Sequence, residues 1–316
     1  MTPAAGRRTV SGLSPEKHSP GAVAGALSAT TAFLLWGVFP VYWKQLEGVP
    51  ALELIAHRIV WLLVILLLVL GWRGNFRRLQ PAFADARVLG RNLLSSAFLA
   101  VNWTVFVWAI THDLVIESSL GYFLVPLVNV ALGFVLLHER LRPAQWIAIG
   151  LAAAGVAFLL LRVGHVPWVA LVLAGTWSAY GLMKKKSPLG PIAGLTTEAL
   201  ILFPVALGLI LWWHHTGVGA FGRADARTHG FMVGSGLVTA IPLLLFAHGA
   251  QRIRLTTLGL LQYVAPTVQF LIGLLVYHEV FDATRLQAFG LIWIGLVLYS
   301  ADGVWAQRRL LLPSVR

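Results

Sequence analysis

Three ionisable side chains lie close together in a stretch that is otherwise apolar: Glu53, His57 and Arg58. On a helix Glu53 and His57 share one face because they are four residues apart, whereas Arg58 lies about 140° around the axis from Glu53. If the stretch crosses a membrane, an ionised side chain at its centre costs about 2.5–3.5 kcal/mol and needs a partner or water. Arg58 could then recognise an anion, while Glu53 or His57 exchanges protons. The alternative is a structural clasp near the interface, with Arg58 snorkelling outward.

A fourth ionisable residue, Glu198, lies in a later apolar stretch. It stands either as a protonatable coupling site or as the partner of the cationic run Lys184–Lys186, and the sequence favours neither. Nothing near Glu198 replaces the neighbouring His57 and Arg58. The two stretches are therefore predicted to be chemically unequal.

Aromatic and amide side chains form a third group of candidates. They suit a cavity that binds a partly apolar molecule through few hydrogen bonds. Pro126 and Pro266 lie in the same stretches, and each frees a backbone carbonyl for a ligand or water. The alternative is that these residues only pack helices together, with Gly and Ser as small contact residues. The candidate cavity residues are Asn102, Trp103, Tyr122, Asn129, Gln262 and Tyr263.

Enzymatic motifs are poor. The chain has two His-Glu pairs, but neither has the second histidine of a zinc-protease helix, because His138 is followed at that position by Arg142 and His278 by Asp282. It has no glycine-rich nucleotide-binding loop with a lysine, and no cysteine for thiolate chemistry. We expect no catalytic residues, no metal site and no cofactor.

The composition is that of a membrane protein. Hydrophobic residues make up 58% of the chain and charged residues only 11%, where a soluble domain carries about 25%. The 13 Trp residues fit a chain that meets the membrane interface. The net charge of +12 lies in short gaps between apolar runs, which argues against a nucleic-acid groove. The expected partners are the lipid bilayer and a small molecule, and the oligomeric state is undetermined.

The apolar runs predict the spans, since a spanning helix needs about 20 mostly apolar residues. Ten runs meet this criterion. They are 22–43, 52–71, 90–110, 115–137, 144–162, 166–183, 192–213, 230–250, 256–277 and 286–306.

An internal repeat relates the two halves of the chain. At an offset of 140 residues Pro126 recurs as Pro266, and at an offset of 141 Trp36 recurs as Trp177. Each half contains five predicted helices, and five is odd, so the second copy is predicted to be inverted in the membrane. Inverted repeats are typical of secondary transporters that open alternately to either side. The other matched pairs are Gly133 with Gly273, His138-Glu139 with His278-Glu279, Gly150 with Gly290, Gly155 with Gly295, and Lys44 with Lys185.

Loop charges predict the orientation. The loops of one predicted face carry 18 Lys and Arg residues and those of the other carry 5, while Arg58 falls inside a span. Positive loops stay in the cytoplasm. Both termini are therefore expected there, which requires an even number of spans. Residues 1–21 are polar and are predicted to be a disordered cytoplasmic tail, and 307–316 a second cytoplasmic tail.

Short motifs in several of the apolar runs are distinctive. They are Trp36-Gly37 through Pro40, Tyr42-Trp43-Lys44, Ala56-His57-Arg58, Asn102-Trp103, Glu117-Ser118-Ser119-Leu120-Gly121-Tyr122-Phe123, and Leu261-Gln262-Tyr263 with Pro266-Thr267. These motifs resemble those of RarD-type permeases of the EamA family, within the drug/metabolite transporter superfamily. The resemblance covers about residues 22–305 and implies ten helices with a central substrate cavity between the repeats, but it does not define the substrate.

The predicted fold is an all-α membrane protein, with ten transmembrane helices in two inverted five-helix repeats, 22–162 and 163–306. The predicted function is a plasma-membrane permease or exporter of small metabolites or drugs, working by alternating access, with proton coupling as one option. One alternative is a structural or receptor-like membrane protein that transports nothing. The other, an intramembrane enzyme, would need a nucleophile–base pair or a metal constellation, and the sequence offers neither.

Overall fold

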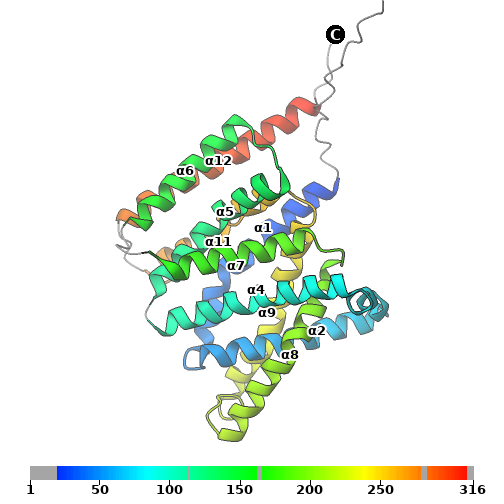
Figure 1. Cartoon of the computed structure of the whole chain (residues 1–316). Helices are drawn as coiled ribbons and strands as arrows, with labels where there is room; N and C mark the ends of the chain where they lie inside the picture. Colours follow the sequence, from blue (N-terminus) through cyan, green and yellow to red (C-terminus); the bar gives the residue numbers. More distant parts are fainter. Residues whose placement is uncertain (1–19, 113, 162–165, 279–282, 312–316) are drawn as a thin grey trace, which may run out of the picture.

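The computed structural model of the chain describes residues 20–112, 114–161, 166–278 and 283–311, and all regular secondary structure in these ranges is helical (Figure 1). The longer helices are α1 (Pro20–Trp43), α2 (Ala51–Trp72), α4 (Ala86–Thr111), α5 (Val115–Leu137), α6 (Pro143–Leu160), α7 (Trp168–Lys185), α8 (Pro191–Thr216), α9 (Ala226–Ala250) and α12 (Ala283–Leu311). The shorter ones are η1 (Lys44–Leu46), η2 (Phe76–Leu79), α3 (Gln80–Ala84), α10 (Leu255–Leu261) and α11 (Val264–Leu275).

Eight helical segments in the described ranges are long and apolar enough to cross a membrane. They comprise α1, α2, α4, α5, α6, α8, α9 and the α10–α11 pair. The all-helical, membrane-type fold predicted from the sequence is thereby confirmed. α7 and α12 are helical too, but the apolar part of α12 is shorter, Leu286–Asp302. The number of spans, ten, stays a prediction.

The predicted apolar ranges fall on these helices, and 115–137 coincides with α5. α4 and α9 each begin four residues earlier than the apolar pattern predicted. Both extensions start with an aspartate cap, since Asp85 accepts a hydrogen bond from the backbone N–H of Arg87, and Asp225 from that of Thr228. The hydrogen bonds from Thr228 also hold the pKa of Asp225 below its ordinary value. The caps therefore set where these two helices begin.

The predicted helix 256–277 is broken in the structure. α10 ends at Leu261 and α11 begins at Val264. The physical reason is Pro266, which has no N–H to donate to the carbonyl of Gln262 four residues earlier. A second difference lies in the segment between α2 and α4, predicted as a polar loop, which contains the short helices η2 and α3.

The packing of helices is repeated between the two halves. α1 packs on α9 and α11, and its counterpart α7 packs on α4 and α5. Three further contacts join counterpart helices directly, namely α2 with α8, α5 with α10, and α6 with α12. In Figure 1, α6 and α12 lie side by side along one edge of the bundle, while α2 and α8 lie toward the opposite edge.

α1 and α7 run in opposite directions. A Cβ atom on Gly25, near the start of α1, would touch Arg252, which follows the end of α9. Lys185, the last residue of α7, donates to a backbone carbonyl in the same α9–α10 segment and lies 3.9 Å from Glu139. α1 therefore begins where α7 ends. We call this the Glu139 end of the bundle, and the opposite end, where α1 finishes beside Lys44, the Lys44 end.

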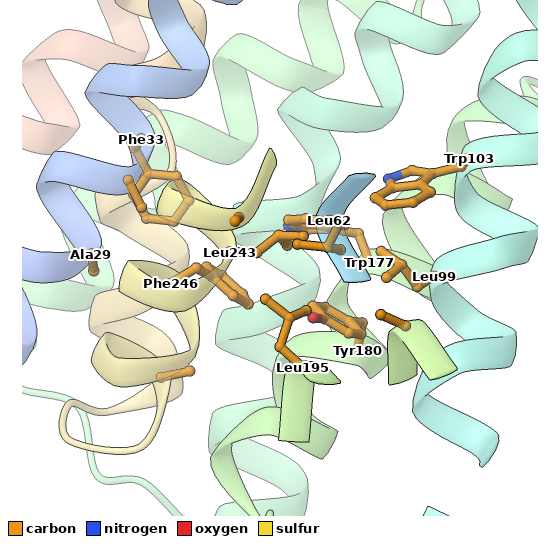
Figure 2. Close-up of a cluster of buried hydrophobic side chains, with 14 of the residues drawn as sticks. Ala29, Phe33, Leu62, Leu99, Trp103, Trp177, Tyr180, Leu195, Leu243 and Phe246 are labelled. Atoms are coloured by element: carbon orange, nitrogen blue, oxygen red, sulfur yellow. The ribbon is translucent and has the colours of Figure 1, made fainter. Parts of the chain in front are cut away.

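Aromatic side chains fill the interior between α1, α7 and α9 (Figure 2). The ring centroids of Trp36 and Trp177 are 5.4 Å apart, and Tyr180 stacks on Phe246 at 6.1 Å. Phe33 meets Phe246 edge-on at 6.1 Å. Figure 2 shows Phe33, Trp177, Tyr180 and Phe246 converging from three helices. Such pairs stabilise by about 0.5–1.5 kcal/mol beyond their area burial, so this aromatic cluster holds the halves together.

Most of the predicted N-terminal tail, residues 1–19, lies outside the described residues, as do Glu279 and residues 312–316. α12 continues to Leu311 and so includes the first part of the predicted C-terminal tail, 307–316.

Candidate functional site

The side chain of Arg58 on α2 points into the bundle. Its Nε donates to the hydroxyl of Thr239 on α9 at 3.1 Å. Its guanidinium carbon lies 4.4 Å from the ring centroid of Trp103 on α4 and 5.1 Å from that of Trp43 on α1. Tyr122 on α5 is close enough to interact with it electrostatically. Arg58 therefore meets side chains from both halves and does not extend along the outside of the bundle. We call these five residues the Arg58 cluster.

The charge of Arg58 has no ionic counterpart within the described part of the chain, where the ion pairs found involve other residues. Two aromatic faces compensate it in part, because a cation over a ring gains about 0.5–2 kcal/mol. Arg58, Trp43 and Tyr122 are each partly exposed, whereas Trp103 is 7% exposed. The cluster is thus a partly exposed cation next to two aromatic ring faces.

Glu53 lies just over one turn before Arg58 and His57 directly precedes it, but these two residues serve a different contact. Both Glu53 oxygens accept backbone N–H groups of the α8–α9 segment, from Ala220 and from Phe221, each at 2.9 Å. The ring of Phe221 lies 4.5 Å from that of His57, and His57 Nε2 is 4.0 Å from Glu53. These contacts clasp the α8–α9 segment to the start of α2.

Glu198 lies at the Glu139 end, where its carboxylate has an ion-pair partner and two hydrogen-bond donors. Its carboxylate is 2.6 Å from Nζ of Lys184, and it accepts hydrogen bonds from Ser95 at 2.6 Å and from Tyr180 at 3.3 Å. Glu198 is 1% exposed and Lys184 3%. Of the two interpretations of Glu198, this geometry corresponds to the partner of the Lys184–Lys186 run.

The amide candidates lie at helix contacts. Asn129 on α5 meets Gln262, just after α10, at 3.5 Å. The hydroxyl of Tyr263 donates to the backbone carbonyl of Phe123 at 3.1 Å. Asn102 on α4 donates to α7, to the carbonyl of Leu173 and the hydroxyl of Thr176, each at 3.0 Å. Each contact ties two helices together, and none includes Arg58.

A hollow of about 180 Å³ lies at the Lys44 end between α1 and α11, and so between the halves. The Nζ atom of Lys44 sits 3.7 Å from the ring centroid of Tyr277 beside it. The hollow is lined by Pro40, Lys44, Gln269, Ile272, Gly273 and Tyr277.

The opposite end is closed around Glu139. Its two oxygens accept the backbone N–H groups of Leu255 and Thr256, at 2.7 and 3.0 Å, at the start of α10. His138, which ends α5 in the left-handed conformation (φ 53°), precedes it. A Cβ atom on Gly133 would lie 2.8 Å from the carboxylate, so a glycine there leaves it room. The sequence excluded a zinc-protease motif at His138-Glu139 and matched the pair to His278-Glu279, but it did not predict that Glu139 would bind the start of α10.

The structure brings together three of the predicted site residues, Arg58, Trp103 and Tyr122. It adds Trp43 and Thr239, which were not among the candidates. Trp43 had a signal, because it belongs to the Tyr-Trp-Lys motif at the end of α1. Thr239 had none, since only the packing of α9 on α2 places it there. The described residues contain no group of three or more potential metal ligands, so what this geometry offers is ion and ring recognition.

The known proteins whose sequences resemble this chain are named as transporters or as RarD proteins. The model of the EamA-like transporter family matches residues 23–161. The chain is 41% identical over 284 residues to the uncharacterized transporter YojE of Bacillus subtilis, which covers 89% of this chain and 94% of that protein. It is 40% identical over 290 residues to protein RarD of Streptomyces exfoliatus, with 90% of each chain covered. A Pseudomonas aeruginosa relative, 30% identical over 92% of this chain and 97% of its own, is named chloramphenicol-sensitive protein RarD.

A solved structure resembles this one in fold. Its chain superposes with a TM-score of 0.68 at 21% sequence identity, covering 90% of this chain and 98% of that one. At this identity the likeness concerns the fold alone.

Proposed function

The chain belongs to the EamA-like transporter family, as a RarD-type permease in the plasma membrane, and from this premise we propose that it is a secondary transporter. It moves a small metabolite or drug through alternating access, with proton coupling as one option. Ten spans in two inverted five-helix repeats provide the framework.

Reciprocal contacts between the halves carry this proposal. A Cβ atom on Gly155 of α6 would lie 2.8 Å from the carbonyl of Ala288 on α12. Shifting both positions by 140 residues gives the contact of Gly295 with the carbonyl of Ala148, where a Cβ atom would lie 2.6 Å away. Contacts in which i meets j and j meets i are the signature of a two-fold axis. They support a two-fold relation between the repeats.

The direction of α1 and α7 supports an axis in the membrane plane. These helices are repeat counterparts, yet α1 begins at the Glu139 end, where α7 finishes. The two left-handed residues that are not glycine, His138 at φ 53° and His278 at φ 52°, are also 140 positions apart within the described ranges. Both observations agree with inverted repeats.

The state of the two ends supports alternating access. At the Glu139 end the carboxylate binds the start of α10 and lies near Lys185, and Arg142 pairs with Asp302 at 3.0 Å. At the Lys44 end there is a hollow between the halves. We assign this arrangement to a conformation that is closed at the cytoplasmic Glu139 end and accessible from the outside.

One observation favours the alternative of a non-transporting membrane protein. The aromatic cluster of Phe33, Trp36, Trp177, Tyr180 and Phe246 fills the interior between α1, α7 and α9. In a transporter this cluster must separate during the cycle, whereas in a structural protein it would stay packed.

Topology and accessibility test the proposal. A reporter that is active only outside the cytoplasm should give signal when fused at Arg223 and none when fused after Arg316; the reverse pattern would refute the topology.

Because the chain has no cysteine, a single Gln269→Cys can be labelled in cells with a membrane-impermeant thiol reagent. Labelling from outside that changes when substrate is added supports alternating access. Uptake into proteoliposomes, guided by metabolite profiling of cells with and without the gene, tests transport itself, and its absence for every metabolite so identified would favour the non-transporting alternative.

A further inference from the structure

We propose that the Arg58 cluster binds the carboxylate of the transported molecule, and that the substrate class is small organic monocarboxylates with a flat or apolar body. This inference rests on the proposed function, since it names the cargo of the same transporter. Its starting point is the missing counterion of Arg58.

An unpaired cation inside a membrane protein is costly. Insertion scales give about 2.5–3.5 kcal/mol for arginine at a helix centre, and the hydroxyl of Thr239 and two ring faces offset only part of this. By contrast, Lys184, a cation that is 3% exposed, is neutralised by Glu198 at 2.6 Å. Part of the desolvation cost of the Arg58 charge is therefore not offset within the described residues, and an anionic ligand would offset it.

The geometry of the guanidinium selects a carboxylate. Thr239 occupies Nε, so the two terminal nitrogens stay available for a bidentate pair with a planar anion. Two other cations at this end have partners of their own, since Lys44 lies over Tyr277 at the hollow and Arg227 donates to Gln45, and neither is among the contacts of Arg58. A single cation balances a monoanion, whereas a phosphate dianion would leave a negative charge unpaired.

The surroundings favour a ligand with an apolar body and without a required ammonium group. Glu53, the carboxylate nearest along α2, already accepts two backbone N–H groups and so is not available to bind an amine. Trp43 and Trp103 present ring faces to the cation, and Tyr122 is close enough to interact with it electrostatically. Faces of this kind suit a flat or apolar group next to the carboxylate.

Direct binding to the purified full-length chain in detergent tests the inference without any transport step. The probes are 3-phenylpropanoate, its neutral amide 3-phenylpropanamide, and inorganic phosphate. Thermal unfolding reports binding because a ligand of the folded state raises its stability. Tryptophan fluorescence gives a second readout of binding.

We expect the carboxylate to bind wild-type protein at least about tenfold more tightly than the amide, because the amide cannot form the charge-assisted pair. Arg58→Gln should abolish this preference, and Arg58→Lys should reduce it because the ammonium lacks the planar fork. Arg252→Gln removes an exposed arginine at the Glu139 end and should leave the preference unchanged.

Three outcomes would overturn the inference: equal affinity for acid and amide, a wild-type preference in Arg58→Gln, or tighter binding of phosphate than of the carboxylate. Absence of any stabilisation by 3-phenylpropanoate, benzoate or cyclohexanecarboxylate at about 10 mM, roughly ten times the upper end of ordinary KM values, would overturn it as well. The acid–amide comparison needs no variant, so poor folding of Arg58→Gln leaves the test intact. Binding without transport would refute the transporter and keep the site, whereas transport of another class without carboxylate binding would do the opposite.

Discussion

The counterpart helices α2 and α8 use their inward-facing charges in opposite ways. The 141-residue offset of the repeat places His57 over Glu198 and Arg58 over Ala199. On α8 the carboxylate is neutralised by Lys184, receives two further hydrogen bonds and is sealed from solvent. On α2 the cation has ring faces and one hydroxyl but no anion among the described residues.

Two helices that are repeat counterparts therefore need not carry the same charged groups or the same partners. A buried ion pair whose members satisfy each other needs nothing from a ligand, so Glu198 and Lys184 fix α8 against α7. Arg58 has no such partner among the described residues, and in our proposal an anionic ligand supplies it. Four substitution experiments test this contrast, and they are ordered by the size of the effect we expect.

Removing one member of the ion pair should strongly destabilise the protein. Glu198→Ala leaves Lys184 charged and buried without its partner, which costs about 3–5 kcal/mol. Abundance in the membrane and thermal stability in detergent should both fall. The double variant Lys184→Met with Glu198→Leu should recover most of the stability, since an apolar pair of similar volume replaces a buried ion pair well. Normal stability of Glu198→Ala combined with lost transport would break the contrast.

Removing Arg58 should change function rather than stability. Arg58→Ala deletes a cation that no carboxylate holds, so the protein should still insert and accumulate. Transport per molecule of a carboxylate-bearing cargo should fall by about tenfold or more, the usual cost of losing one partner of a desolvated pair, and Arg58→Lys should also weaken it. The measurement is transport normalised to membrane protein level. Low abundance with wild-type rates per surviving molecule would assign Arg58 a structural role.

Matching substitutions on the two sides of the α6–α12 contact should reduce the stability of the protein by similar amounts. Gly155→Ala and Gly295→Ala each place a methyl group against a backbone carbonyl of the facing helix, and overpacking of this kind costs about 1–3 kcal/mol. Their repeat neighbours Gly150 and Gly290 face open space, so alanine there should be neutral. Thermal unfolding of the four variants checks this. Unequal losses at Gly155 and Gly295 would contradict the two-fold relation of α6 and α12.

The smallest effect is expected at Glu53. Glu53→Gln loses the charge-assisted bonds to Ala220 and Phe221, worth about 1–2 kcal/mol, and loosens the α8–α9 segment locally. Hydrogen exchange of these two amides should quicken while the global unfolding temperature changes little. Glu47→Gln, at an exposed position on the same end, is the control. Unchanged exchange in Glu53→Gln would mean that the carboxylate does not hold the segment.

Apolar runs predicted the helices well. A membrane span must form its backbone hydrogen bonds within itself, so it is a helix, and crossing the bilayer takes about 20 mostly apolar residues. The limits of α4 and α9 were missed, although Asp85 and Asp225 are ordinary capping signals in polar sequence. The break at Gln262-Tyr263 was missed because apolar content does not report a lost backbone hydrogen bond. Pro266 was the available signal.

The candidate site was predictable only in part. Arg58 stood out because a charge in an apolar run is rare, and this rarity does not depend on the fold. The partners of Arg58 come from α1, α4, α5 and α9, and a sequence pattern cannot rank residues on four helices by their distance to one side chain. For Glu198, the sequence left two interpretations open because the position of Lys184 depends on how α7 packs against α8.

The contact between α6 and α12 has a consequence for biosynthesis. α6 packs chiefly on α12 and otherwise on α5, yet roughly 150 residues separate the end of α6 from the end of α12. At the usual synthesis rates the ribosome needs on the order of ten seconds for this stretch. During that time the small-residue face of α6 must wait in the bilayer without its partner. α12, which is synthesised after the other described helices, therefore completes the packing of the first half of the protein.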